Sequence, residues 1–118
     1  MSRHFRLTDY LGHMHEAATD ARSFVQGMAV EDFLKDRRTQ QAVVMSLLIL
    51  GEATTKVMAA YPDDVARYPH IPWRQMRGMR NRIAHGYFEI NYGIVWRTVE
   101  EALPALIAQL EHLLQRSS

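Results

Sequence analysis

One short segment of the chain, Arg80 to Tyr87, gathers polar and titratable side chains that could act together on a phosphate. The guanidinium group of Arg80 offers a fixed positive fork suited to a phosphate, and His85 can exchange a proton near neutral pH. Asn81 can hydrogen-bond a phosphate or orient the histidine. Such groups could cleave RNA without a metal. A base takes the proton of the 2′-hydroxyl, the arginine stabilises charge on the phosphate oxygens, and an acid protonates the leaving oxygen.

The spacing of these residues leaves the arrangement of the site open. Arg80 and His85 are five residues apart, which separates them by about 140° around a helix, whereas Asn81 and His85 share a face. Either the helix unwinds near Gly86, or two chains meet in a symmetric dimer and each completes the site of the other. A structural alternative is a surface pair of arginine and asparagine, with a histidine that interacts with the helix dipole in the last turn.

Two further side chains are candidates for a supporting role. Glu52 interrupts an otherwise apolar helix and could hydrogen-bond Arg80 or an arginine of a partner chain, or simply be a paired structural carboxylate. Arg77 is three residues before Arg80 and could widen a phosphate-binding patch, or be a solvated arginine. Five arginines and no acidic residue lie between Asp64 and Glu89, so a local cationic surface is expected although the net charge is only +1.

No metal site and no cofactor are expected. His13 and His15 are two residues apart and cannot face one ligand on a helix, and no carboxylates lie near them at ligand spacing. The absence of cysteine excludes disulfides and zinc–thiolate sites. Trp73 and Trp96 could stack on bases, but packing or interface roles are the favoured interpretation.

Hydrophobic periodicity predicts four main helices in an up-down bundle, so the fold class is all-α and residues 1–118 form a single domain. The predicted boundaries are, in chain order, Leu7 to Met28 (N-cap Thr8, stop Gly27), Glu31 to Ala60 (break near Asp36), a linker from Asp63 to His70, Pro72 to His85 (stop Gly86), a connection from Tyr87 to Tyr92, and a last helix capped by Asn91 and kinked at Pro104. The longest apolar run, Ala42 to Leu50, is too short for a membrane span, and Met1 to Thr8 resembles no secretory signal. We therefore expect a cytoplasmic protein without a membrane partner.

The text Arg80-Asn81-x-x-Ala84-His85-x-Tyr87 resembles the signature of the HEPN superfamily, an arginine followed four to six residues later by a histidine. More narrowly, the chain is similar to the HepT family, toxins paired with an MNT (minimal nucleotidyltransferase) antitoxin. The similarity extends from Leu7 to Leu114. Flanking matches are Gly51-Glu52-Ala53, Trp73, Val95-Trp96 and Leu103-Pro104-x-Leu106.

The resemblance implies a helical HEPN-like bundle that forms a two-fold homodimer, with a higher oligomer left open. It implies a metal-independent ribonuclease that acts on RNA, with Arg80 and His85 from two protomers as the catalytic pair and Asn81 beside them. It also implies that Tyr87 receives AMP from the nucleotidyltransferase antitoxin, which would place negative charge and bulk beside the cleft and oppose RNA binding.

A second hypothesis uses the same residues without catalysis. The cleft could bind nucleotide or RNA, or the chain could be a partner subunit of a nucleotidyltransferase. Both hypotheses need Arg80 and Tyr87, but only the ribonuclease needs His85 to exchange a proton.

Overall fold

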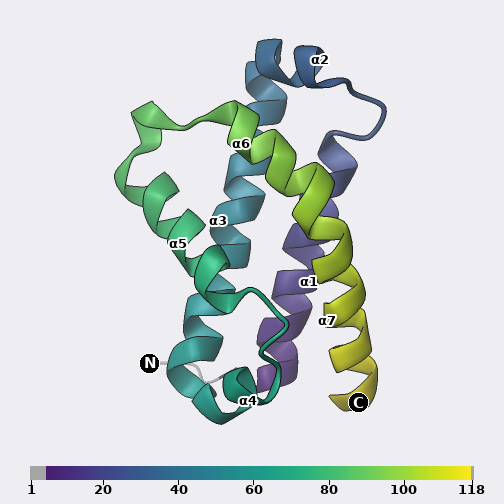
Figure 1. Cartoon of the computed structure of the whole chain (residues 1–118), viewed down its shortest axis with the longest axis vertical. Coiled ribbons are helices and arrows are strands. Elements are labelled where there is room, and N and C mark those ends of the chain that lie inside the picture. Colours follow the sequence, from purple (N-terminus) through teal and green to yellow (C-terminus); the bar gives the residue numbers. More distant parts are fainter. Residues whose placement is uncertain (1–4, 118) are drawn as a thin grey trace.

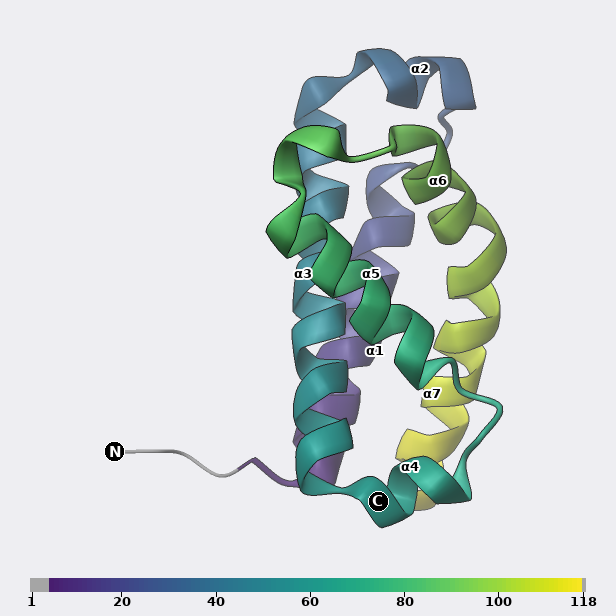
Figure 2. The ribbon, with the colours of Figure 1, turned by 60° about the vertical axis from the view of Figure 1, so that its left-hand side comes forward.

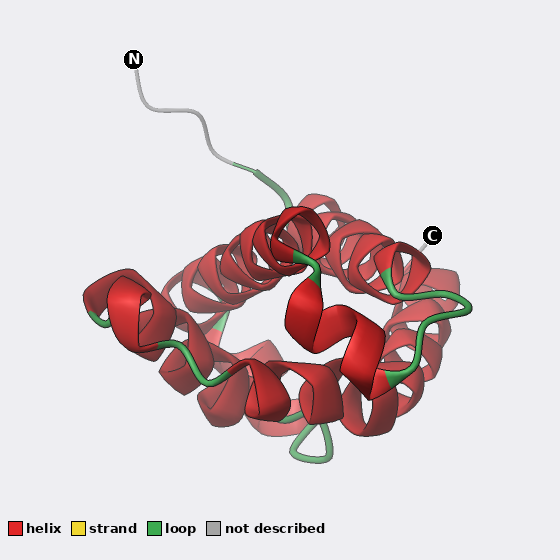
Figure 3. Cartoon of the chain, turned by 90° about the horizontal axis from the view of Figure 1, so that it is seen from above, coloured by secondary structure: helices red, strands yellow, loops and turns green. Residues whose placement is uncertain are grey.

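The computed structural model describes residues 5–117, and within that range all regular elements are helical (Figure 3). The elements in chain order are α1 (Leu7–Phe24), α2 (Val30–Lys35), α3 (Arg37–Ala60), α4 (Pro62–Arg67), α5 (Trp73–His85), a 3-10 turn η1 (Tyr87–Glu89), α6 (Tyr92–Arg97), a π-helical turn η2 (Thr98–Ala102) and α7 (Leu103–Ser117). The four long helices α1, α3, α5 and α7 alternate in direction (Figure 1), so the predicted all-α, up-down bundle is confirmed. The ends of the predicted domain, residues 1–4 and 118, lie outside the described range.

The core forms where α1 packs between α3 and α7, and α5 packs on the other side of α3. The apolar residues of α1 are buried in the core, and the buried leucines of α7 belong to the same core. Figure 2 shows α5 running obliquely across the bundle, and in Figure 1 its C-terminal end projects to the side of α3. This crossing places the last turns of α5, which carry the candidate residues, at the surface.

The break predicted near Asp36 is confirmed, and its physical cause is a helix cap. The carboxylate of Asp36 accepts hydrogen bonds from the backbone N–H of Thr39 at 3.1 Å and from its hydroxyl at 2.8 Å. These bonds favour the charged carboxylate, so they hold the pKa of Asp36 below its usual value. Asp36 therefore ends α2 and begins α3.

Three predicted boundaries were wrong at the residue level. The first helix ends at Phe24, with Val25 as its C-cap, and not at Met28. The N-cap of α1 is Arg6 instead of Thr8, because the carboxylate of Asp9 accepts the backbone N–H of Arg6 at 3.0 Å. The predicted linker from Asp63 to His70 contains the short helix α4, which begins at Pro62. Proline is well suited to the first helical position, and acidic residues in the first turn complement the helix dipole, so the residue read as a stop is also a start.

The last helical run contains the predicted irregularity near Pro104. Asn91 caps α6 as predicted, since its side-chain oxygen accepts the N–H of Ile94 at 3.1 Å. Proline has no N–H and its ring clashes with the carbonyl of the residue four before it. Upstream of it, the hydrogen bonding changes to the wider π pattern, with the N–H of Leu103 bonded to the carbonyl of Thr98. The run accordingly changes direction between α6 and α7 (Figure 1).

Among the described helices, α3 alone is long and apolar enough to cross a membrane by length and composition. Half of its apolar window is buried inside the bundle, as in the core helix of a globular protein.

Candidate active site

The guanidinium group of Arg80 is held by two acceptors where α5 packs on α3. Its Nε and Nη2 atoms donate to Oε2 of Glu52 at 3.2 and 2.9 Å, and Nη1 donates to Oδ1 of Asn81 at 3.0 Å. The side chains of Arg80 and Glu52 are 31% and 48% exposed, so a ligand can reach the pair. The predicted contact between Glu52 and Arg80 is confirmed, and it fixes the orientation of the arginine fork.

A glycine allows Arg80 to sit this close to α3. Gly51 is buried, and a Cβ atom placed on it would collide with the Cβ of Arg80 and lie 2.8 Å from its Cγ. The same atom would lie 3.1 Å from the carbonyl oxygen of Met76, one turn earlier on α5. A residue larger than glycine would therefore push α5 away and move Arg80 from Glu52.

His85 is the last residue of α5 and points to solvent without a hydrogen-bond partner among the described residues. The helix is regular from Arg80 to His85, and the backbone leaves helical geometry only at Gly86, with φ −131° and ψ 43°. Unwinding near Gly86 therefore occurs too late to bring His85 toward Arg80. Asn81 contacts Arg80 and makes no hydrogen bond with His85 in the described structure, so its predicted role of orienting the histidine is not what this geometry shows.

Tyr87 lies in the 3-10 turn η1, and the residue is 48% exposed. The neighbouring Phe88 is 98% exposed, and the two rings meet edge to face with their centroids 5.7 Å apart. Two residues after the histidine, the chain thus presents an aromatic pair to solvent.

The predicted cationic surface lies along the outward side of α5. Arg77 is exposed and lies between Arg74 and Arg80 on consecutive turns. Neither Arg74 nor Arg77 has an ion-pair partner among residues 5–117, whereas Arg67 pairs with Asp64 at 3.4 Å. Like charges three residues apart repel on a helix, and cations are disfavoured near a helix N-terminus. Ion pairs with described residues therefore do not neutralise Arg74 or Arg77.

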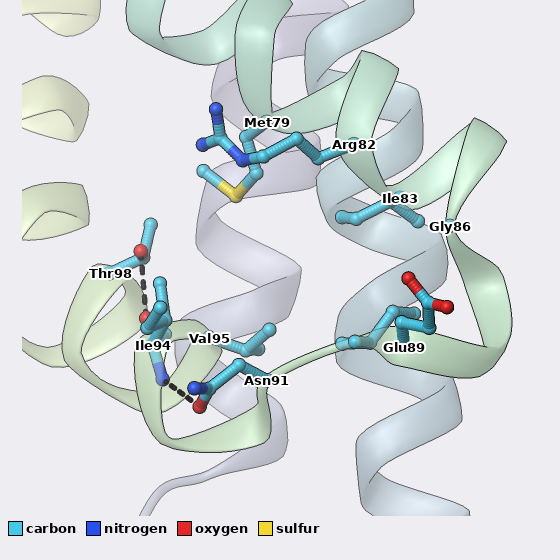
Figure 4. A pocket seen from close by; sticks show the side chains of 10 residues that line it. Met79, Arg82, Ile83, Gly86, Glu89, Asn91, Ile94, Val95 and Thr98 are labelled. Atoms are coloured by element: carbon cyan, nitrogen blue, oxygen red, sulfur yellow. Dashed lines mark hydrogen bonds between the residues drawn. The ribbon is translucent and has the colours of Figure 1, made fainter.

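A cavity that the sequence analysis missed lies between α5, η1 and α6, with a volume of about 170 Å³. Figure 4 shows the side chain of Arg82 beside Met79 on one side of it, with Glu89 on the side nearer Gly86. Arg82 lies about 160° around α5 from Arg80, so this cavity faces away from the Arg80–Glu52 pair. The signal that could have found it is the helical spacing of Met79, Ile83 and Gly86.

Groups of three or more histidine or carboxylate side chains that could hold a metal ion do not occur within residues 5–117. The groups that this helix end presents are the oriented guanidinium group of Arg80, the amide of Asn81 and the solvent-facing imidazole of His85. These groups can bind a phosphodiester and transfer protons.

Comparison with known proteins connects this geometry to a family. The family model described as ribonuclease HepT-like matches residues 14–113. A protein of Thermococcus cleftensis named "Probable ribonuclease HepT" is 40% identical over 106 residues, covering 89% of this chain and 93% of the relative. A protein of Caldanaerobacter subterraneus, named as a candidate RNase, is 34% identical over 107 residues, covering 91% and 93% of the two chains. No solved structure gives a significant match.

Proposed function

Since the chain belongs to the HepT-like ribonuclease family, we propose that it is an endoribonuclease that cleaves RNA without a metal ion. The observation that carries the proposal is the arginine fork of Arg80, which Glu52 and Asn81 hold on the same exposed helix end as His85, a histidine without a hydrogen-bond partner among residues 5–117. Preorganised positive charge is most effective where negative charge develops in a transition state.

The chemistry follows from the capacities of these groups. One histidine takes the proton of the 2′-hydroxyl, and the 2′-oxygen attacks the adjacent phosphorus. The bond from phosphorus to the 5′-oxygen breaks, and that oxygen leaves with a proton from water. Arg80 stabilises charge on the non-bridging oxygens, and the free amide hydrogens of Asn81 can donate to the same phosphate. The products end in a 2′,3′-cyclic phosphate and a 5′-hydroxyl.

A symmetric homodimer removes the problem of the Arg80–His85 angle. Because α5 is regular between these two residues, one chain does not converge them by itself. Exposed apolar side chains support a second copy at this place: Met45 is 57% exposed, and Ile49 is 48% exposed on the same face of α3 as Glu52. A two-fold axis beside this face would bring Arg80 of one protomer toward His85 of the other.

Regulation by a partner enzyme completes the proposal. The chain acts as a cytoplasmic toxin, and an MNT-type nucleotidyltransferase antitoxin transfers AMP to Tyr87. The hydroxyl oxygen of Tyr87 bonds to the α-phosphorus of ATP, pyrophosphate leaves, and the phenolic proton passes to the transferase or water. The accessible position of Tyr87 in η1 supports this role. The added phosphodiester puts a negative charge two residues from His85, which disfavours RNA phosphates.

The proposal is tested with purified, unmodified protein in EDTA. RNA should be cut, and an otherwise identical substrate with deoxyribose at the scissile position should resist cleavage, because it lacks the attacking hydroxyl. His85→Ala should lower the rate by roughly two to four orders of magnitude. Protein that binds RNA but never cuts it, or a His85→Ala variant as active as the parent, would instead establish the non-catalytic binding module.

A further inference from the structure

A second groove, distinct from the cavity at Arg82, lies where η1 packs beside the start of α3. Its volume is about 410 Å³. In Figure 2 the segment that follows α5 passes in front of the upper part of α3, below α2, and residues of both segments line the groove. We call this feature the η1 groove and define it by six of its lining residues: Lys35, Arg37, Gln41, Tyr87, Phe88 and Tyr92.

The aromatic wall of the η1 groove is exposed to an unusual degree for a folded protein. Phe88 is 98% exposed, although a phenylalanine ring gains free energy when it is buried. Tyr87 stands edge to face with it and is also exposed. An exposed ring beside a second aromatic side chain offers a flat surface on which a nucleobase can stack.

Two cations, Lys35 and Arg37, also line the groove. Lys35 and Arg37 flank Asp36, yet neither forms an ion pair or a side-chain hydrogen bond with a described residue. The carboxylate between them is already committed, because both of its oxygens accept hydrogen bonds from Thr39. Gln41 is exposed beside these cations, and its amide can donate and accept. The groove thus joins an aromatic surface to two cations free to bind a phosphate.

We propose that the η1 groove binds a nucleoside monophosphate group, with the phosphate at Lys35 and Arg37 and the base against Phe88. The nucleotide has two sources with the same chemistry: the AMP attached to Tyr87, or a nucleotide of bound RNA next to the cut. In the first case the groove holds the modifying group beside the cleft. In the second it selects RNA that extends beyond the scissile phosphate. The inference rests on the proposed ribonuclease function and its regulation at Tyr87.

The binding itself is tested with AMP and the unmodified full chain, followed by the NMR signals of the aromatic rings. AMP should shift the signals of Phe88 and Tyr92, and adenosine, which lacks the phosphate, should bind more weakly. A Lys35→Gln/Arg37→Gln variant should abolish the difference between AMP and adenosine. The control Arg97→Gln/Arg116→Gln removes the same charge from two exposed arginines on other helices and should behave as the parent. Ring signals that do not respond to AMP would overturn the proposal.

Two further experiments show whether the groove binds the AMP attached to Tyr87 or a nucleotide of bound RNA. With protein modified at Tyr87, a phosphodiesterase should release AMP roughly threefold to tenfold faster from the Lys35→Gln/Arg37→Gln variant than from the control. With unmodified protein, Phe88→Ala should raise KM for a long RNA by at least roughly fivefold, the cost of one lost stacking contact, and leave a dinucleotide unaffected. The arm that responds identifies the source.

Failure of the inference is separable from failure of the proposed function. If the parent cuts RNA and is modified at Tyr87 but none of these variants differs from its control, the groove proposal is wrong and the ribonuclease stands. If the parent never cuts RNA but AMP shifts the ring signals, the ribonuclease is wrong and the groove stands. If Phe88→Ala dissociates the dimer and leaves AMP binding unchanged, Phe88 is an interface residue and the groove proposal is wrong.

Discussion

Gly51 of α3 and Arg80 of α5 touch so closely that a Cβ atom on the glycine would overlap the side chain of the arginine. This contact brings α5 onto α3 at the level where Glu52 can reach the guanidinium group. The position of the Arg80 guanidinium group thus depends on the absence of a side chain at Gly51, one residue before its partner Glu52.

Gly51→Ala should therefore lower both stability and RNA cleavage. Overpacking of this kind costs about 1–3 kcal/mol, and a displacement of Arg80 by about 1 Å can cost roughly a hundredfold in rate. Gly12→Ala is the matched control, because a Cβ there meets nothing within 4 Å and should stabilise the helix by about 0.5–1 kcal/mol. Urea unfolding and a cleavage assay measure the two effects. Equal activity of both variants would show that the close contact does not position Arg80.

Glu52→Gln should separate activity from stability. The pair with Arg80 is partly exposed, so its loss should change the free energy of unfolding by less than about 1 kcal/mol. The less strongly held guanidinium group should lower cleavage by roughly tenfold or more. Glu111→Gln is the control, since this exposed carboxylate pairs with His15 at 2.9 Å on other helices. A Glu52→Gln enzyme with full activity would make Glu52 a structural carboxylate only.

Mixing two inactive variants should restore cleavage if the site is shared between protomers. In a mixed dimer of Arg80→Ala and His85→Ala chains, one of the two sites keeps both native residues. Random pairing makes half of the dimers mixed, so roughly a quarter of the parent activity should return. Native mass spectrometry confirms that mixed dimers form. Mixed dimers without activity would mean that Arg80 and His85 act within one chain.

Arg77→Gln should weaken RNA binding in a salt-dependent way. For single-stranded nucleic acid, each lost phosphate contact lowers the slope of log affinity against log salt by about 0.7. Arg74→Gln should have the same effect if the strand follows this side of α5, whereas Arg116→Gln changes the net charge equally on another helix. Fluorescence anisotropy with a non-cleavable deoxyribose-substituted RNA gives the slopes. If all three variants gave the same slope, Arg74 and Arg77 would act only through the net charge of the protein and not through contacts with phosphates.

Stability should depend on pH through the cap at Asp36. Hydrogen bonds from Thr39 lower the pKa of Asp36 in the folded state. The contribution of this cap to the free energy of unfolding is therefore fully present when the pH is above the pKa of an aspartate in the unfolded chain, about 3.9. That contribution is lost as the pH falls through the folded-state pKa. Asp36→Asn keeps an acceptor but does not titrate, so it should be less stable than the parent at neutral pH, and the difference should shrink in acid. Urea midpoints across this range test the prediction, with Asp20→Asn as the control.

Helix types and most boundaries were predictable because they rest on local signals. The cap at Asp36, the stop at Gly86 and the cap at Asn91 each depend on one side chain or one backbone preference. The prediction failed at Pro62, where proline ends one helix and starts the next. Proline can end one helix or begin the next, and both roles are compatible with its restricted backbone. The sequence around Pro62 therefore does not show which role applies, and the tertiary structure is needed to decide.

The candidate site was predictable in its residues but not in its contacts. The residue pattern of the motif indicated Arg80 and His85, and Glu52 was noticed because it is a charged residue in an apolar helix. That Asn81 binds Arg80 instead of His85 depends on how far the arginine fork reaches, which spacing alone does not give. The η1 groove joins residues about fifty positions apart, and only the packing of η1 beside α3 brings them together.

The π-helical turn η2 has a consequence for how the family varies in length. A π turn holds one residue more than an α-helix between the same two ends, so its loss would restore a regular helix. The Asn91 cap on one side and the leucine face of α7 on the other would each keep their packing. We therefore expect homologous chains without a proline at the position of Pro104 to tolerate a one-residue deletion within Thr98–Ala102, and alignments of them to gain a gap there instead of in the flanking helices.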